Sequence, residues 1–197
     1  MGDSGRVPAV IYGYNYTTTQ GRTLVVHDRG GTRISCDLIK PATAMFDLTE
    51  FRPYVGYEGP LMNVMGTIAM AFQMTSVQMD YNLTGVDPLC VNGPSGEANS
   101  CGIHIHQGFH CNDPATVGAH FWLTPDANGN DVADPWQYDA YYEGATTNGY
   151  TSGPIRVEYG YPWASDASLG LQGTAGRVVI VHDYAGNRIA CAQTPVE

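Results

Sequence analysis

Two histidines one residue apart give this chain its clearest chemical signal. His104 and His106 lie within residues 102–108, next to Ile103 and Ile105. Because alternate residues of a β-strand point to the same face, both imidazoles would face one side while both isoleucines face the core. Imidazole nitrogens are the commonest metal ligands that proteins offer. This segment therefore predicts one half of a metal site.

Two further histidines and an arginine stand in well-defined sequence contexts elsewhere in the chain. His120 follows a Gly-Ala pair, His182 ends an apolar run, and Arg188 stands six residues after His182. Three or four imidazoles suit a redox-active ion such as copper, and an arginine supplies a fixed positive charge that attracts a small anion. His110 has no counterpart in this pattern, and we expect an ordinary loop histidine there.

The segment around His182 occurs twice in the chain. Residues 21–28 match residues 176–183, and in each copy an arginine stands six residues, and a cysteine nine residues, beyond the histidine. In the first copy these residues are His27, Arg33 and Cys36. Both copies have the pattern of a strand, a tight turn and a second strand.

The repeat sets the domain organisation that we expect. We interpret residues 1–40 as the C-terminal strands of a preceding repeat, present as a partial copy, and residues 41–197 as one complete domain. Either hairpin, at residues 21–39 or at residues 176–194, has the sequence needed to close that domain. We expect the C-terminal hairpin to do so, and the alternative is that the first hairpin takes its place.

Composition narrows the fold class. The 197 residues are 43% apolar and include 24 glycines and 12 prolines, which suits short strands and many turns. We therefore expect an all-β fold, a Greek-key β-sandwich or flattened barrel of about eight strands. We expect five methionines in the predicted strands to pack in the core rather than to bind copper(I): Met62, Met65, Met70, Met74 and Met79.

Charge and hydropathy exclude several kinds of partner. The formal net charge is -10 and no cluster of Lys or Arg is present, which argues against binding to nucleic acid or to anionic lipid. No apolar run reaches the roughly 18 residues that a membrane-spanning helix needs. We expect a monomer, with a swapped dimer as the alternative.

The five cysteines favour disulfides, because no two of them have the Cys-x-x-Cys spacing of zinc or redox motifs. Cys90 and Cys101 bracket a loop of about ten residues that a local disulfide would close. Two glycosylation sequons, at Asn15 and Asn82, agree with an extracellular location. Because no signal peptide is visible, we expect a fragment of a secreted protein.

In their order and context, the histidines and Arg188 resemble the copper site of the Cu/Zn superoxide dismutase family. The resemblance covers most of residues 44–197. It implies that Arg188 is the active-site arginine and that Cys111 and Cys191 form a disulfide, with Cys36 free or competing with Cys191 for Cys111. It also implies four copper ligands: His104, His106, His120 and His182.

Two departures from the zinc-containing enzymes are informative. Residues 121–181 contain no histidine, so the zinc site of those enzymes has no counterpart. Only five residues separate His182 from Arg188, where those enzymes carry a long charged loop. In both features, the missing zinc site and the short segment before Arg188, the chain resembles the copper-only superoxide dismutases. Its duplicated hairpin resembles the arrangement of the copper-only superoxide dismutase repeat proteins. We therefore expect copper and no zinc.

Without zinc, the outer nitrogen of His120 needs another partner to fix the ring. A carboxylate is the natural choice, and the candidates in the following loop are Asp139 and Glu143, of which we favour Glu143 as a catalytic residue beside Arg188 and His120. The resemblance implies disproportionation of superoxide to dioxygen and hydrogen peroxide by Cu(II)/Cu(I) cycling. The alternatives are a copper-binding or copper-buffering module with little turnover, and a structural repeat whose site is vestigial.

Overall fold

The computed structural model of the protein describes residues 22–38, 44–61, 63–72, 76–122, 133–137, 140–158 and 174–195. The chain divides into two compact units, Met1–Pro41 and Ala42–Glu197. That the first unit belongs to a preceding repeat stays a prediction.

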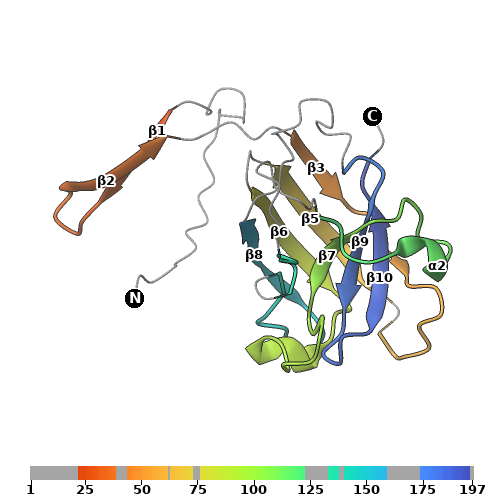
Figure 1. Ribbon diagram of the computed structural model, residues 1–197. Helices are drawn as coiled ribbons and strands as arrows, with labels where there is room; N and C mark the ends of the chain where they lie inside the picture. Colours follow the sequence, from red (N-terminus) through yellow and green to blue (C-terminus); the bar gives the residue numbers. More distant parts are fainter. Residues whose placement is uncertain are drawn as a thin grey trace. The chain divides into compact units, whose positions relative to one another are not determined.

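The first unit contains a β-hairpin, drawn in orange in Figure 1. Its strands are β1 (Thr23–His27) and β2 (Arg33–Leu38), and among the described strands they pair only with each other. Exposed apolar side chains on this hairpin include Leu24, Val26 and Ile34.

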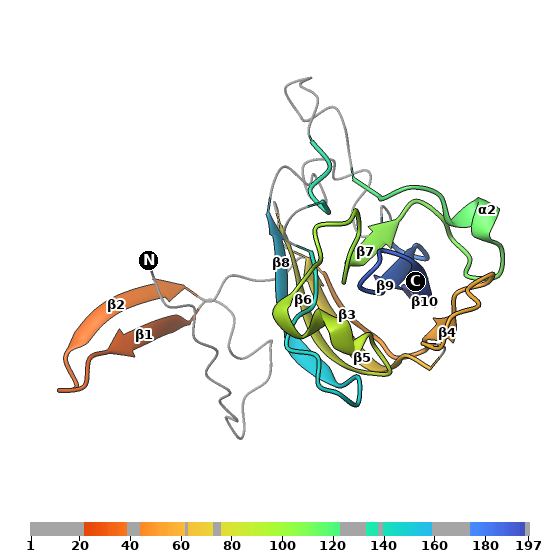
Figure 2. The ribbon, with the colours of Figure 1, turned by 90° about the horizontal axis from the view of Figure 1, so that it is seen from below.

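The described residues of the second unit form two antiparallel sheets of four strands each. One sheet has the order β3 (Ala44–Leu48), β5 (Met65–Phe72), β6 (Ser76–Thr84), β8 (Thr151–Glu158), and the other has the order β4 (Arg52–Pro53), β10 (Arg188–Gln193), β9 (Val178–His182), β7 (Ile103–His106). Figure 2 shows the sheets as opposite layers, and neither closes into a barrel. The predicted all-β sandwich is confirmed, in its open form.

In the described connections of this unit lie two short helical segments, the 3-10 helix η1 (Pro88–Asn92) and α2 (Pro114–Val117). In the described part of the chain, no helix has the length and apolar character needed to cross a membrane.

The strands of the first sheet alternate between the core and solvent, as the period of a half-buried strand requires. In β6, for example, Val77, Met79 and Leu83 are fully buried between more exposed neighbours. Met70 is buried as well, but Met65, at the first position of β5, is 62% exposed, so the expectation of core packing is wrong for Met65. Met62 and Met74 lie outside the described residues.

The second sheet is covered on both faces at its centre. All residues of β7 and β9 are buried. Ile103 and Ile105 belong to the main core, whereas Val178 and Ile180 pack with Cys191 in a second apolar cluster. Because side chains alternate along a strand, the two histidines of β7 face away from the main core and are nevertheless buried.

The C-terminal hairpin closes this sheet, as we expected. β9 pairs with β7, placing His104 opposite Ile180 and His106 opposite Val178. β10 pairs with β9 on one side and with β4 on the other. Pairing on both edges fixes the position of His182, the last residue of β9, relative to the histidines of β7.

Candidate metal centre

Three imidazoles from two neighbouring strands meet in the second sheet. His104 and His106 come from β7 and His182 from the end of β9, and the exposed fraction of each side chain is 2% or less. One ligand nitrogen from each of the three lies within 4.8 Å of the others. The structure thus brings together three of the predicted ligands in a compact group that can hold a metal ion.

In each of these imidazoles, one buried nitrogen has no hydrogen-bond partner. The three atoms are His104 Nδ1, His106 Nε2 and His182 Nε2. Burying a polar atom without a partner is costly, and in folded proteins such atoms are rare. Three of them in one cluster are explained if they donate their lone pairs to a metal ion.

Backbone carbonyls fix which nitrogen of His106 and of His182 can serve as a ligand. Nδ1 of His106 donates to the carbonyl of Gly118 at 3.1 Å, and Nδ1 of His182 donates to the carbonyl of Gly102 at 3.3 Å. A neutral imidazole that donates through Nδ1 carries its lone pair on Nε2. The unpartnered nitrogens of both rings are therefore the ones with a free lone pair.

Gly102 also makes room for the ring of His104. A Cβ atom at this position would lie 2.4 Å from Nε2 of His104, closer than any real contact of this kind. The glycine immediately before β7 is thus required by the packing of the imidazole, and a larger residue would push the ring out of the cluster.

The fourth predicted ligand, His120, joins the cluster from a different part of the chain. It forms an isolated antiparallel bridge with His106, and its ring centroid lies 4.5 Å from that of His104 and 5.0 Å from that of His106. Its Nδ1 donates to Oδ2 of Asp134 at 2.7 Å, which leaves Nε2 with the lone pair. All four predicted histidines therefore lie together.

Burial keeps the imidazoles of His104, His106 and His182 uncharged. Desolvation lowers the pKa of His104 and His182 well below the ordinary value, and the neighbouring imidazoles add to this effect. Desolvation also lowers the pKa of His106 to about 3, against the opposing effect of its bond to Gly118. At neutral pH these three rings are neutral, which is the state that binds a metal ion.

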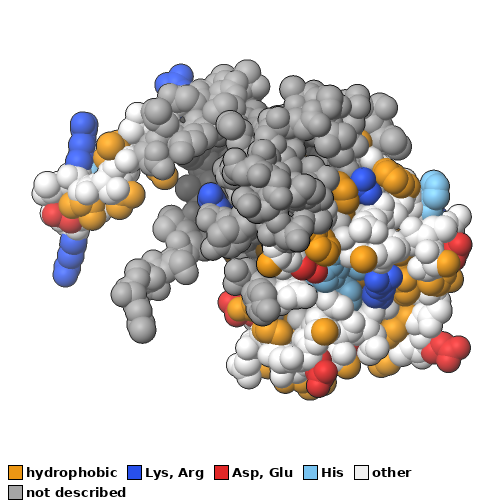
Figure 3. All heavy atoms as spheres, viewed as in Figure 1, with side chains coloured by type: hydrophobic (Ala, Val, Ile, Leu, Met, Phe, Trp, Pro, Cys, Tyr) orange, Lys and Arg blue, Asp and Glu red, His pale blue; other side chains and the backbone are white. Residues whose placement is uncertain are grey.

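Arg188 begins β10 next to the cluster, opposite His182 in the β9–β10 pair. Its guanidinium donates to the hydroxyl of Tyr54 at 3.0 Å and to the carbonyl of Gly118 at 2.8 Å. Both partners are neutral, so they hold the positive charge in place without cancelling it. Figure 3 shows basic and histidine side chains side by side on one face of the molecule.

A disulfide ties the segment that carries Gly118 to β10. Cys111 and Cys191 are bonded across 80 residues, and α2 and Gly118 follow Cys111 directly in the chain. The same carbonyl of Gly118 accepts from His106 and from Arg188. This disulfide therefore stabilises the loop that positions the arginine relative to the imidazoles. The structure contains this bond as the resemblance implied.

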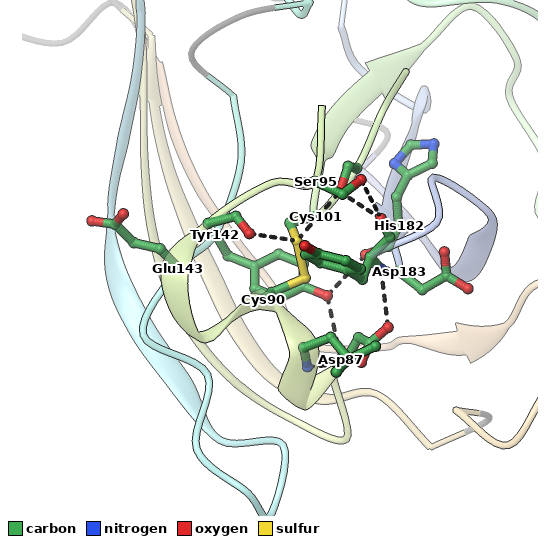
Figure 4. The surroundings of a disulfide bond; sticks show 12 residues. Asp87, Cys90, Ser95, Cys101, Tyr142, Glu143, His182 and Asp183 are labelled. Atoms are coloured by element: carbon green, nitrogen blue, oxygen red, sulfur yellow. Dashed lines mark hydrogen bonds between the residues drawn. A yellow bond between two sulfur atoms is a disulfide. The ribbon is translucent and has the colours of Figure 1, made fainter. Parts of the chain in front are cut away.

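The second disulfide, Cys90–Cys101, holds the start of β7 (Figure 4). The N–H of Cys101 donates to the carbonyl of Asp183 at 2.8 Å, just after β9. The buried hydroxyl of Tyr142 donates to the carbonyl of His182 at 2.9 Å and accepts from the N–H of Asp87 at 3.3 Å. These bonds lock the ends of β7 and β9 together where the ligands meet.

The prediction that Glu143 partners His120 is wrong. Its side chain is exposed, and Figure 4 shows it pointing away from His182. Asp139 lies outside the described residues. Asp134 takes the role instead. It directly precedes the turn at residues 135–137, and its Oδ2 accepts a hydrogen bond from Nδ1 of His120.

Asp134 is fixed by a buried tryptophan. Its Oδ1 accepts from the N–H of Trp136 at 2.9 Å, and the Trp136 indole N–H donates to the carbonyl of Phe121, the residue after His120, at 2.8 Å. Trp136 is 1% exposed. The Asp-Pro-Trp sequence at 134–136 could have indicated this partner of His120, because an aspartate before a proline often starts a turn and a tryptophan tends to be buried.

The remaining predicted residues lie outside the cluster. His110 is exposed, as we expected for a loop histidine. Cys36 is a free, exposed thiol. The two disulfides are typical of an oxidising compartment.

Comparison with known proteins adds no family to this picture: no protein-family model matches the chain, and no curated protein matches it significantly.

Proposed function

We propose that the protein binds copper through His104, His106, His120 and His182 and acts as a copper-dependent superoxide dismutase without zinc. The observation that carries the proposal is the convergence of three buried, unpartnered imidazole nitrogens within 4.8 Å, beside an arginine with neutral partners. The likeness of the sequence pattern to the copper-only superoxide dismutases supports copper as the ion.

The donor set fits copper. It consists of imidazoles, which suit both Cu(II) and Cu(I), and among the described residues no thiolate or carboxylate joins the group formed by His104, His106 and His182. A bound copper ion would supply one-electron chemistry, in which one superoxide is oxidised to dioxygen and a second is reduced, with two protons, to hydrogen peroxide.

The chain's own residues supply the electrostatics and the orientation. Superoxide is an anion and the protein carries a net charge of -10, so a local positive charge is needed to attract it. The Arg188 guanidinium, held by Tyr54 and Gly118, supplies that charge next to the imidazoles. Because neither partner is an acid, the positive charge is not neutralised, and a guanidinium has more N–H donors than these two bonds use.

Asp134 supports an arrangement with a single metal ion. Without a zinc ion, the outer nitrogen of His120 needs another partner, and here Nδ1 of His120 donates to Oδ2 of Asp134 at 2.7 Å. The carboxylate fixes the ring, raises the basicity of Nε2 and holds the Nδ1 proton. The absence of histidine from residues 121–181 agrees with this arrangement.

The alternative function is a copper-binding or copper-buffering module with little turnover. The two functions differ in rate rather than in binding, so the deciding experiment loads the metal-free protein with one equivalent of Cu(II). Electron paramagnetic resonance then reports nitrogen coordination, and superoxide decay is measured by pulse radiolysis. We expect nitrogen coordination and a rate well above that of the same concentration of aqueous copper. A rate no higher, with copper bound, would favour buffering, and no bound copper would refute both.

We place this activity in an oxidising, extracellular compartment. The two disulfides support that placement, because such bonds persist where thiols are not kept reduced.

A further inference from the structure

The β1–β2 hairpin repeats the pairing of the β9–β10 hairpin residue by residue. His27 pairs with Arg33 as His182 pairs with Arg188, and Val25 pairs with Cys36 as Ile180 pairs with Cys191. In both hairpins the register shifts at the same place, between the pair that contains the histidine and the next pair.

The turns of the two hairpins are also alike. The side chain of Asp28 accepts from the N–H of Thr32 at 2.8 Å, and that of Asp183 accepts from the N–H of Asn187 at 2.7 Å. A glycine with positive φ occupies the same turn position in both, at 84° and 83° for Gly31 and Gly186. The sequence repeat is therefore a repeat of one three-dimensional unit.

What differs between the two hairpins is burial. In the C-terminal hairpin, Val179, Val181 and Ile189 face the main core and are completely buried. The residues at the same positions of the first hairpin are Leu24, Val26 and Ile34, and they are 60%, 48% and 62% exposed. Three apolar side chains are thus exposed at the positions that fill a sandwich core in the C-terminal hairpin.

The chemical groups of the C-terminal hairpin are present on the first hairpin too. His27 stands where His182 supplies a candidate ligand, Arg33 where Arg188 supplies the positive charge, and the free thiol of Cys36 where Cys191 forms its disulfide. A hairpin that served only as a linker would have no need of all three.

We propose that β1–β2 is the closing hairpin of a second sandwich of the same kind, one that lacks a closing hairpin of its own. It would pair with that sandwich's equivalents of β7 and β4, bury Leu24, Val26 and Ile34 in its core, and donate Cys36 to a disulfide. His27 would complete a second metal centre there, and Arg33 would stand beside it. The roles of His27 and Arg33 rest on the proposed function, whereas the docking and the disulfide do not.

The partner is fixed by the contacts that β9–β10 makes here. The corresponding slot in Ala42–Glu197 is already filled, since β9 pairs with β7 and β10 with β4. The partner must therefore present a free strand edge with a His-x-His pair, a short strand for the outer edge, and a cysteine equivalent to Cys111. The disulfide forms by exchange: the Cys36 thiolate attacks a mixed disulfide between glutathione and the partner's cysteine, and reduced glutathione leaves.

A variant of the full chain can serve as such a partner. In the full-length double variant Val181→Asp with Cys191→Ser, a charge at a core position prevents β9–β10 from docking, and Cys111 is left free. The protein is equilibrated in a glutathione redox buffer, and disulfides are mapped by mass spectrometry after alkylation. We expect a Cys36–Cys111 disulfide, within one chain or between two, in most molecules.

The matched control adds Val26→Asp to this double variant. Val26 is exposed in the first hairpin, so an aspartate there should not destabilise the hairpin itself. It should prevent the hairpin from docking on a sandwich, where this position would be buried. In the control, the fraction of molecules that contain the Cys36–Cys111 disulfide should be at least about tenfold lower, because a buried charge is strongly unfavourable. Equal amounts in both variants would mean random pairing of two free thiols and would overturn the proposal.

A second variant covers the case in which the double variant does not fold. The full chain with Cys191→Ser alone keeps every core residue, and there Cys36 competes with the intact C-terminal hairpin for Cys111. A Cys36–Cys111 disulfide that forms there in the folded protein, and that Val26→Asp suppresses, supports the proposal. If the Cys36–Cys111 disulfide forms neither in the double variant nor in the Cys191→Ser variant, the proposal is overturned.

Measuring copper retention beside the disulfide distinguishes a failure of this inference from a failure of the proposed function. If the Cys36–Cys111 disulfide forms but neither this variant nor the unmodified chain retains copper, the docking stands and the proposed function fails. If the unmodified chain retains copper but the disulfide never forms, the proposed function stands and the docking fails.

Discussion

Nδ1 of His120 lies 2.7 Å from Oδ2 of Asp134, and this bond determines how the fourth imidazole of the cluster is presented. Because the carboxylate accepts the Nδ1 proton, Nε2 is left as the ligand atom. Asp134 is itself held by the N–H of Trp136, so the ring orientation depends on a turn anchored in the core.

Replacing Asp134 should therefore weaken copper binding without removing a ligand. We expect Asp134→Asn to lower copper affinity about 10- to 100-fold, because the group that orients His120 loses its charge. Competition with a chelator of known affinity measures the change. Glu143→Gln is the matched control and should leave the affinity unaltered; the assignment fails if the control has the larger effect.

His106 tests the ligand set directly. His106→Ala removes a nitrogen that has no protein partner, and we expect loss of stoichiometric copper while both disulfides and the β-rich circular dichroism spectrum remain. His110→Ala, at an exposed position outside the cluster, should bind copper normally. Full copper loading of the His106 variant would contradict the site.

Arg188 tests catalysis separately from binding. Arg188→Ala should keep copper but slow superoxide decay by about tenfold or more, because a local charge concentrates the anion at the site. The rate of the unmodified protein should also fall with added salt, and the rate of the variant should fall less. Arg156→Ala, on the exposed side of β8, provides a control of equal charge change. An unchanged rate in the Arg188 variant would remove the arginine from the mechanism.

The buried imidazoles make the metal-free protein sensitive to acid. In the unfolded chain a histidine titrates near pH 6.5, whereas burial lowers the pKa of His106 to about 3 and that of His104 and His182 well below the ordinary value. Below pH 6.5 the unfolded state therefore binds more protons than the folded state, and the free energy of unfolding falls as the pH falls.

The expected slope is about 1.4 kcal/mol per pH unit for each histidine that stays neutral in the folded protein. Urea denaturation of the metal-free protein between pH 6.5 and pH 4 measures it. His106→Gln should reduce the slope by the share of one histidine, and His110→Gln should not. A slope that is the same in all three proteins would argue against neutral, buried rings.

Tyr142 tests the bonds behind the metal cluster. Its hydroxyl donates to the carbonyl of His182 and accepts from the N–H of Asp87, and burial raises its pKa, so it stays protonated. Tyr142→Phe leaves both groups unpaired and should lower the free energy of unfolding by about 1–3 kcal/mol. Tyr141→Phe, at the partly exposed neighbour, serves as the control. Chemical denaturation that shows no difference between these variants would mean that the bonds contribute little.

Local patterns in the sequence were sufficient for much of this description. The alternation at residues 103–106 predicts that both imidazoles share a face, because the period of a strand is set by its own backbone. The hairpins at residues 21–39 and 176–194 are evident as a repeat, and the short interval between Cys90 and Cys101 indicates their disulfide. The all-β fold follows in the same way from composition and short apolar runs.

Tertiary structure alone decided the rest. The sequence offers two similar hairpins that could close the sandwich, and only the pairing of β9 with β7 and of β10 with β4 shows which of them does so. The partner of His120 is Asp134 rather than Glu143, because the buried Trp136 donates from its indole to the carbonyl of Phe121 and from its backbone N–H to Asp134. Loops obey no short period, and their side chains are positioned by contacts between distant residues, which one-dimensional patterns do not contain.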